Sequence, residues 1–130
     1  MKPEVLMQYA IDAMDRAYAP YSHYQVGAAL LCADGAVYQG CNIENASYSP
    51  TICAERTAFA KAVAEGQREF VAIAICGGMN GEITRLCTPC GVCRQVMREF
   101  CADDFAVYMA KPEGIETRTL AQLLPDSFQL

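Results

Sequence analysis

The chain has 130 residues, the length of one domain, since a second domain would have too few residues for its own core. Hydrophobic residues make up 53% of it and charged residues 19%, a composition that excludes an intrinsically disordered chain. The net charge is −5, and the ten Lys and Arg residues form no basic stripe, which argues against nucleic acid as a partner. A small, uncharged substrate fits this composition better. The high apolar fraction also favours burial of some surface against other subunits.

The first half of the chain predicts a helix, a hairpin and a second helix. Apolar residues at helical spacing predict an amphipathic helix over residues 3–18, with Pro3 in its first turn. Strands are expected over residues 26–32 and 36–42, joined by a hairpin-type turn at Ala33-Asp34-Gly35. A polar loop over residues 43–50 precedes a helix over residues 53–65, which Gly66 ends.

The second half alternates strands and helices. The apolar run over residues 70–76 predicts a buried strand, followed by a loop over residues 77–88. A helix over residues 91–100, a strand over residues 105–110 and a helical turn over residues 120–124 complete the chain. The order α-β-β-α-β-α-β is typical of an α/β sheet covered by helices. We therefore expect one α/β domain spanning residues 1–130.

Eight cysteines are many for a chain of this length. The first residues contain no apolar signal segment, and no apolar run approaches the ~18 residues that a membrane span needs, so we expect a cytoplasmic protein. Thiols stay reduced in that compartment, where closely spaced cysteines more often bind metal or act in catalysis than form disulfides. Four cysteines lie in apolar stretches and are expected to be small core residues: Cys32, Cys41, Cys76 and Cys101.

The strongest pattern is Cys90-Gly91-Val92-Cys93 at the start of one predicted helix, together with Cys53 at the start of another. A Cys-x-x-Cys pair in this position places both sulfurs on one helix face. The helix N-terminus also favours the thiolate form that binds zinc. Three thiolate ligands leave a position for water, as in catalytic zinc sites, so we expect Cys53, Cys90 and Cys93 to bind zinc.

Two other interpretations of these cysteines stay open. Cys87-Thr88-Pro89-Cys90 is itself a Cys-x-x-Cys pattern, and Cys87 as a fourth ligand would close the site and make it structural. We favour leaving Cys87 out, because it precedes the proline and the helix start and would approach from a different direction. A redox pair at Cys90 and Cys93 would give Cys53 no purpose.

Glu55 follows Cys53 by two residues. In mid-helix this offset, about 200°, would separate the two side chains, but in the first turn a Glu can reach over the helix end toward a metal-bound water. The alternative is an ordinary acidic residue that the helix dipole favours. Beside the three cysteines we favour a catalytic role.

The chain resembles the cytidine and deoxycytidine deaminases of the small, homotetrameric type. Zinc deaminases of nucleobases carry a His-or-Cys-x-Glu … Pro-Cys-x-x-Cys signature in which the Glu is not a ligand. The resemblance implies a three-layer α/β/α sandwich with a mixed five-stranded sheet, one zinc ion per subunit on the three cysteines, and Glu55 as general acid and base. The segments that carry it are Pro20-Tyr21-Ser22, Val26-Gly27-Ala28-Ala29-Leu30, Gly40-Cys41-Asn42-Ile43-Glu44-Asn45, Cys53-Ala54-Glu55-Arg56-Thr57-Ala58 and Pro89-Cys90-Gly91-Val92-Cys93-Arg94-Gln95-Val96.

The same resemblance implies the substrate contacts. Asn42 and Glu44 would bind the ribose, although without the family they read as a polar turn. The backbone of Ala54 and the carbonyl of Thr88 would contact the pyrimidine edge and the departing amino group. Arg56 would donate hydrogen bonds to the ligand sulfurs.

Three aromatic residues complete the implied site. Tyr24 stands where the family usually has phenylalanine, near the sugar and base, and its additional hydroxyl needs a partner. Phe128 matches an aromatic residue that enters a neighbouring subunit's site, and Tyr48 matches an interface residue lining that site. His23, the only histidine, is expected to be a loop residue without a chemical role.

The implied reaction is zinc-dependent hydrolysis of free cytidine and deoxycytidine to uridine and deoxyuridine plus ammonia, in pyrimidine salvage. An amide and a carboxylate suit sugar hydroxyls and disfavour a 5′-phosphate, which favours nucleosides over nucleotides. The alternatives are a deaminase for a blasticidin-type antibiotic or for a base within nucleic acid, a closed zinc module, and a metal-independent redox protein.

Overall fold

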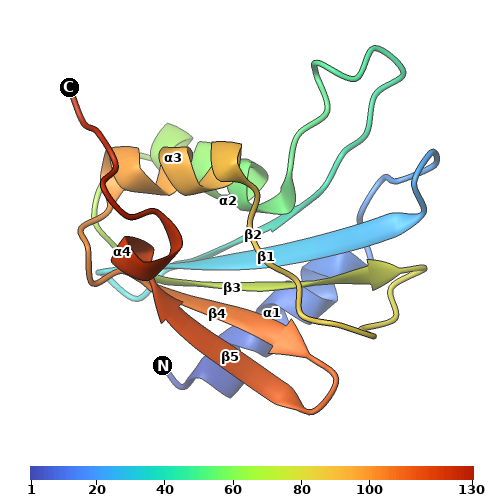
Figure 1. Cartoon of the computed structure of the whole chain (residues 1–130), viewed down its shortest axis with the longest axis horizontal. Helices are drawn as coiled ribbons and strands as arrows, with labels where there is room; N and C mark the ends of the chain where they lie inside the picture. Colours follow the sequence, from blue (N-terminus) through green and yellow to red (C-terminus); the bar gives the residue numbers. More distant parts are fainter.

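A single five-stranded sheet with the order β2-β1-β3-β4-β5 organises the computed structural model, which describes residues 1–130 (Figure 1). Only β3 and β4 run parallel, and the other neighbouring strands are antiparallel, so the sheet is mixed. In order, β1 to β5 are Tyr24–Cys32, Val37–Cys41, Phe70–Met79, Ala106–Lys111 and Gly114–Thr119. The helices α1 to α4 are Pro3–Met14, Ala54–Ala64, Gly91–Phe100 and Leu120–Leu123.

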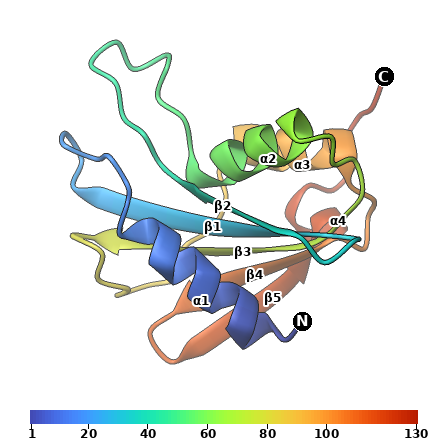
Figure 2. The ribbon, with the colours of Figure 1, turned by 180° about the vertical axis from the view of Figure 1, so that it is seen from behind.

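The helices form layers on both faces of the sheet. Helix α1 covers one face, and α2 and α3 lie side by side on the other (Figures 1 and 2). Side chains alternate along a strand, so in β1 Leu30 packs into the core beneath α2 and α3, whereas Ala29 and Leu31 pack toward α1. The predicted α/β/α sandwich is confirmed. None of the helices has the length and hydrophobicity needed to cross a membrane.

Helix α1 ends at Met14, earlier than the predicted end at residue 18. The chain leaves the helix because Tyr18 pairs with the segment that follows β2. Its amide donates to the Asn42 carbonyl at 2.9 Å, and its carbonyl accepts from the Glu44 amide at 2.8 Å. This long-range pairing overrides a local helical pattern.

Strand β3 continues to Met79, beyond the predicted end at residue 76. Two consecutive glycines, Gly77 and Gly78, favour the prediction of a loop there. In the structure they pair with Val26 and Gln25 of β1. A Cβ on Gly78 would lie 1.7 Å from the Glu82 carbonyl oxygen, so the returning chain requires glycine there. The predicted loop therefore begins later and folds closely over the end of β3.

Strand β5 was not predicted from the hydrophobic pattern and came only from the family resemblance. It is an edge strand that pairs antiparallel with β4, with Lys111 opposite Gly114. Its side chains are largely polar, and Glu116 pairs with Lys111 at 3.2 Å and with Arg118 at 3.1 Å. Charged residues are common on edge strands, and they conceal the strand from an apolar pattern search.

Candidate active site

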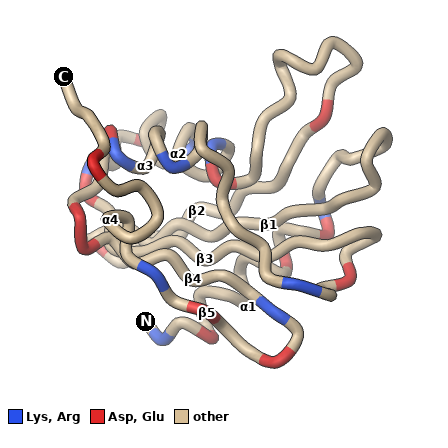
Figure 3. The backbone as a smooth tube through the Cα atoms, viewed as in Figure 1, with Lys and Arg blue, Asp and Glu red and all other residues tan.

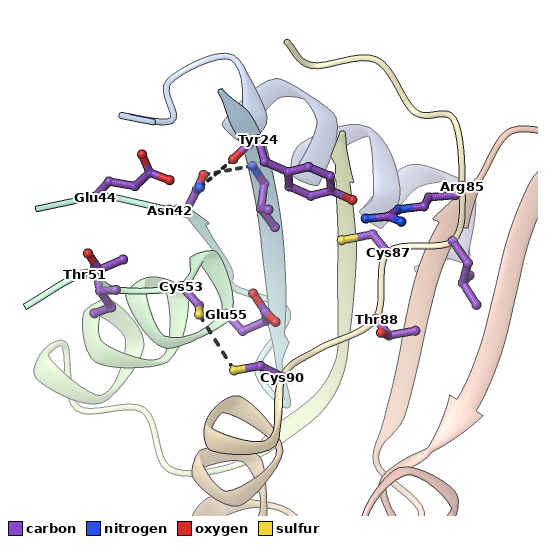
Figure 4. A pocket seen from close by; sticks show the side chains of 13 residues that line it. Tyr24, Asn42, Glu44, Thr51, Cys53, Glu55, Arg85, Cys87, Thr88 and Cys90 are labelled. Atoms are coloured by element: carbon purple, nitrogen blue, oxygen red, sulfur yellow. Dashed lines mark hydrogen bonds between the residues drawn. The ribbon is translucent and has the colours of Figure 1, made fainter. Parts of the chain in front are cut away.

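The sulfurs of Cys53, Cys90 and Cys93 lie within 4.8 Å of one another. Cys53 is the N-cap of α2, Cys90 is the N-cap of α3, and Cys93 lies in the first turn of α3. The Cys53 and Cys90 Sγ atoms are 3.9 Å apart (Figure 4). Zn–S bonds of about 2.3 Å at tetrahedral angles place sulfurs about 3.8 Å apart, so the sulfur positions fit a zinc ion. The structure thus brings together the three cysteines that the sequence selected.

The helix ends and one arginine favour thiolate at this site. Hydrogen bonding with Cys93, supplemented by Arg56 and Cys90, lowers the pKa of Cys53 to about 5. The Arg56 guanidinium donates to the Cys53 sulfur at 3.4 Å. Hydrogen bonding to Cys53, together with burial, raises the pKa of Cys93, so one negative charge is concentrated at Cys53. A cation bound between the sulfurs would release the remaining thiol protons, as metal binding to cysteine does.

Cys87 stands apart from the sulfur cluster. It lies in the wall of the adjacent cavity and is buried, but its sulfur is not among those grouped within 4.8 Å. Burial raises its pKa to about 12, which keeps it a neutral thiol. These observations favour three cysteine ligands over the closed four-cysteine alternative.

Glu55 lies in the first turn of α2, and only 4% of its surface is exposed. Burial raises the pKa of its carboxyl to about 7. A helix-end acid that served only the dipole would remain solvated, so this burial requires another explanation. A carboxyl with a pKa near neutrality can both accept and release a proton at working pH.

A cavity of about 590 Å³ opens beside Glu55 and the cysteines. Its volume is in the range that holds a small ligand such as a nucleoside. In Figure 4, Glu44 lies on one side of the cavity and Arg85 on the opposite side, with Cys53 and Cys90 at its base. Its lining residues are Tyr24, Val26, Asn42, Glu44, Thr51, Ile52, Cys53, Glu55, Arg85, Leu86, Cys87, Thr88 and Cys90.

Two polar residues of the wall are held by the backbone. Asn42 accepts from the Val26 amide at 2.9 Å and donates to the Tyr24 carbonyl at 2.8 Å. Glu44 accepts from the amides of Tyr21 and Ser22 at 3.0 and 3.1 Å and from the Ser22 hydroxyl, which holds the pKa of Glu44 below its usual value. The sequence offered two interpretations of Asn42 and Glu44, a polar turn and a part of the binding site. The structure combines them, because the turn is present and both residues line the cavity. Each side chain retains further hydrogen-bonding capacity for a ligand.

Six wall residues were not selected from the sequence as substrate contacts, among them the apolar Val26 and Ile52. Arg85, Leu86 and Cys87 belong to the segment that leads into Thr88, and Thr51 precedes α2. The one available signal was their position just before the Pro-Cys-x-x-Cys and Cys-x-Glu segments. Among the residues expected there, Thr88 does line the cavity, whereas Ala54 is fully buried at the start of α2 and does not line it.

Tyr48 and Phe128 do not line this cavity. Tyr48 is 81% exposed in the loop after β2, and Phe128 is 66% exposed near the C-terminus. The two segments lie far apart in Figure 1. Within one chain, neither ring lines the cavity beside Cys53, and the role of both rings in a neighbouring copy stays a prediction.

Comparison with known proteins decides the family. Residues 1–109 match the family described as "Cytidine and deoxycytidylate deaminase zinc-binding region". This chain belongs to that family. The cytidine deaminases of Sporosarcina psychrophila and Halalkalibacterium halodurans are each 50% identical to it over 129 residues, which are 98% of this chain and 92% and 95% of those proteins. The crystal structure of cytidine deaminase from Burkholderia pseudomallei superposes with a TM-score of 0.91 at 44% identity, covering 98% of this chain and 100% of that one.

As a cytidine deaminase family member, the chain is a zinc-binding hydrolase, and Cys53, Cys90 and Cys93 form a group of thiols that could hold the metal ion. The charge distribution agrees with a small-molecule enzyme. Figure 3 shows the Lys and Arg positions spread over separate elements and interleaved with acidic positions along the backbone.

Proposed function

We propose that residues 1–130 form one catalytic domain that hydrolyses free cytidine and deoxycytidine to uridine and deoxyuridine plus ammonia. This reaction would serve pyrimidine salvage in the cytoplasm. One observation carries the proposal: three zinc-spaced sulfurs lie beside a buried carboxyl, Glu55, at the base of a nucleoside-sized cavity. The deaminase relatives support the same reaction class.

The chemistry is divided between the metal and Glu55. Zinc held by Cys53, Cys90 and Cys93 would lower the pKa of a coordinated water from about 16 toward about 7. Glu55 accepts the proton of the attacking water and delivers it to N3 of the pyrimidine, which makes C4 electrophilic. After the hydroxyl adds to C4, Glu55 accepts the proton of that hydroxyl and passes it to the amino group, so that the C4–N bond breaks, ammonia leaves and a carbonyl oxygen remains on C4. Such proton transfer typically contributes ~10²–10⁴-fold in rate.

The remaining wall residues orient the nucleoside. The Ala54 backbone would bind the pyrimidine edge, and the Thr88 carbonyl would accept from the departing amino group. Asn42 and Glu44, already fixed by the backbone, would bind the ribose hydroxyls. The negative charge of Glu44 disfavours a phosphate at the sugar, which supports nucleosides over nucleotides.

We infer that the working enzyme is a homotetramer whose sites are completed by neighbouring subunits. Several large apolar side chains are exposed in the single chain, among them Ile43, Tyr48, Val92 and Phe128. In an assembly, other copies of the chain would cover such side chains. Tyr48 and Phe128 would then reach a neighbour's cavity.

The direct test is ultraviolet absorbance of cytidine during incubation with the purified protein, with and without a strong chelator. We expect turnover that stops on chelation and returns with Zn²⁺. Deoxycytidine, cytosine, cytidine monophosphate and a blasticidin-type nucleoside form the comparison panel. Preferential release of ammonia from the antibiotic or the monophosphate would overturn the nucleoside assignment, and turnover that survives metal removal would overturn the zinc mechanism.

A further inference from the structure

The wall of the cavity between Thr88 and Asn42 includes Tyr24, Val26 and Cys87. In Figure 4 the Cys87 sulfur points into the cavity, and the Tyr24 ring lies beside it. The Arg85 guanidinium carbon lies 5.9 Å from the centre of the Tyr24 ring and holds the ring from the outer side. The Tyr24 hydroxyl interacts with the Cys87 thiol, where it partly opposes the effect of burial on the pKa of that thiol.

Cys87 cannot retreat from the cavity. Its backbone amide donates to the Ala110 carbonyl of β4 at 3.3 Å, which ties the segment to the sheet. Its sulfur lies 2.9 Å from the point where a Cβ on Gly77 would stand, so it already occupies the space that this glycine leaves. A larger side chain at position 87 therefore finds no room on the side of Gly77, and the cavity is the open space beside it.

The proposed substrate contacts place one particular edge of the pyrimidine against this wall, and the step rests on the proposed function. Around the ring, N1 carries the ribose beside Asn42, C2 and N3 face Ala54 and Glu55, and C4 faces the cysteines. The amino group on C4 points to the Thr88 carbonyl. The remaining edge of the ring, C5–C6, lies between the amino group at Thr88 and the ribose at Asn42. Cys87 directly precedes Thr88, and the Tyr24 carbonyl is bonded to Asn42, so this edge faces Tyr24 and Cys87.

We propose that Cys87 determines which substituents the enzyme accepts at C5 of cytidine. The thiol is smaller than a branched aliphatic side chain, so the wall leaves room for a group of methyl size. It is also neutral, since burial raises its pKa to about 12, and so it does not repel a polar substituent such as hydroxymethyl. The size of the side chain at position 87 is thus the property that sets this selectivity.

The test compares kcat/KM for 5-methylcytidine with kcat/KM for cytidine in the zinc-loaded wild type and in Cys87→Ala, Cys87→Val and Cys87→Ile. The ratio of the two kcat/KM values is used because a loss of folded or zinc-loaded enzyme lowers both values equally. We expect the ratio to fall by about tenfold or more in Cys87→Ile, to fall less in Cys87→Val, and not to fall in Cys87→Ala, because one methylene in a filled pocket changes discrimination ~10–200-fold. Competitive inhibition by 5-methyluridine relative to uridine should follow the same order without requiring turnover.

Cys32→Val is the matched control, because Cys32 is a buried thiol of β1 that does not line the cavity. Its ratio should equal that of the wild type. A ratio that is the same in the Ala, Cys, Val and Ile forms would overturn the inference, as would a wild type that deaminates cytidine but not 5-methylcytidine. Failure of the zinc-loaded wild type to deaminate cytidine would instead overturn the proposed function, so the two failures are distinguishable.

Discussion

Glu55 follows Cys53 by two positions, and its neighbourhood rather than its residue type sets its chemistry. Local sequence allowed an ordinary acid at a helix start, but the structure buries its carboxyl and raises its pKa to about 7. Burying a carboxyl without benefit costs free energy, so buried acids in clefts are candidates for catalysis. The pKa near neutrality matches an acid and base that must exchange a proton in each turnover.

Replacing Glu55 with Gln should preserve the fold and the bound zinc but lower kcat by ~10²–10⁴, because the amide keeps the volume and cannot transfer the proton. Metal content by atomic absorption and the cytidine assay measure the two properties. Glu99→Gln, on the exposed side of α3, is the matched control and should retain full activity. Wild-type kcat in zinc-loaded Glu55→Gln would remove Glu55 from the mechanism.

Arg56 contacts the metal site through Cys53, to which its guanidinium donates at 3.4 Å. Arg56→Gln should weaken zinc binding by about 10–100-fold, since groups that bond metal ligands typically contribute that much. Competition with a chromophoric chelator measures the affinity. Arg118→Gln, in the edge strand β5, removes the same charge at a distance and should leave zinc affinity unchanged. Equal affinities in the two variants would contradict a role for Arg56 at the site.

At the scale of elements, the site depends on how closely α2 approaches β2. A Cβ on Gly40 would lie 2.3 Å from the Ala54 carbonyl oxygen and 2.6 Å from the Ala58 nitrogen. The missing side chain therefore lets the helix that carries Cys53 and Glu55 lie directly on the sheet. No neighbouring side chain could move to relieve the contact, because the nearest atoms are backbone.

Gly40→Ala should lower the free energy of unfolding by about 1–3 kcal/mol or more and reduce zinc affinity, because α2 must shift away from β2. Thermal unfolding and chelator competition measure these effects. Gly91→Ala, at the start of α3, provides the comparison, since a Cβ at this position would meet no atom within 4 Å, and its unfolding should change little. Similar unfolding of Gly40→Ala and wild type would show that α2 has room to move.

The elements differ in how far local patterns predicted them. Helix α3 was predicted with its observed bounds, because its start is marked by Pro89 and its apolar face is regular. The end of α1 and the end of β3 were wrong by several residues, since long-range pairing at Tyr18 and at Gly77 decides them. Strand β5 was absent from the pattern because its polar side chains are exposed at the sheet edge.

At the scale of the whole molecule, two of the residues expected at the site do not reach it within one chain. Phe128 and Tyr48 are exposed and lie outside the cavity. The C-terminal segment is nevertheless held in place, since Gln95 donates to the Phe128 carbonyl at 3.4 Å and Gln129 donates to the Arg98 carbonyl at 2.9 Å. A held tail with an exposed aromatic ring is consistent with contact to a second copy.

Phe128→Ala should raise KM for cytidine by about tenfold while zinc content stays at the wild-type level, because a base–aromatic stack contributes about 1–3 kcal/mol. Mixing this variant with Glu55→Gln and allowing subunits to exchange should restore activity above that of either alone. Activity is restored only if a site that contains an intact Glu55 from one subunit receives an intact Phe128 from another subunit. Light scattering of each protein checks assembly, and the absence of any restoration in exchanged oligomers would argue against a shared site.

The sequence by itself determined the chemical inventory: three cysteines and Glu55 at helix starts, whose spacing follows from helix geometry and therefore is local information. Only the tertiary structure decided that Cys87 lies outside the sulfur cluster, that Glu55 is buried, that Asn42 and Glu44 face the same cavity, and that Arg85 and Cys87 line it. These outcomes depend on contacts between segments that are distant along the chain. Packing against these distant segments decides which side chains are buried and which cavity a side chain faces. No local sequence pattern encodes that packing.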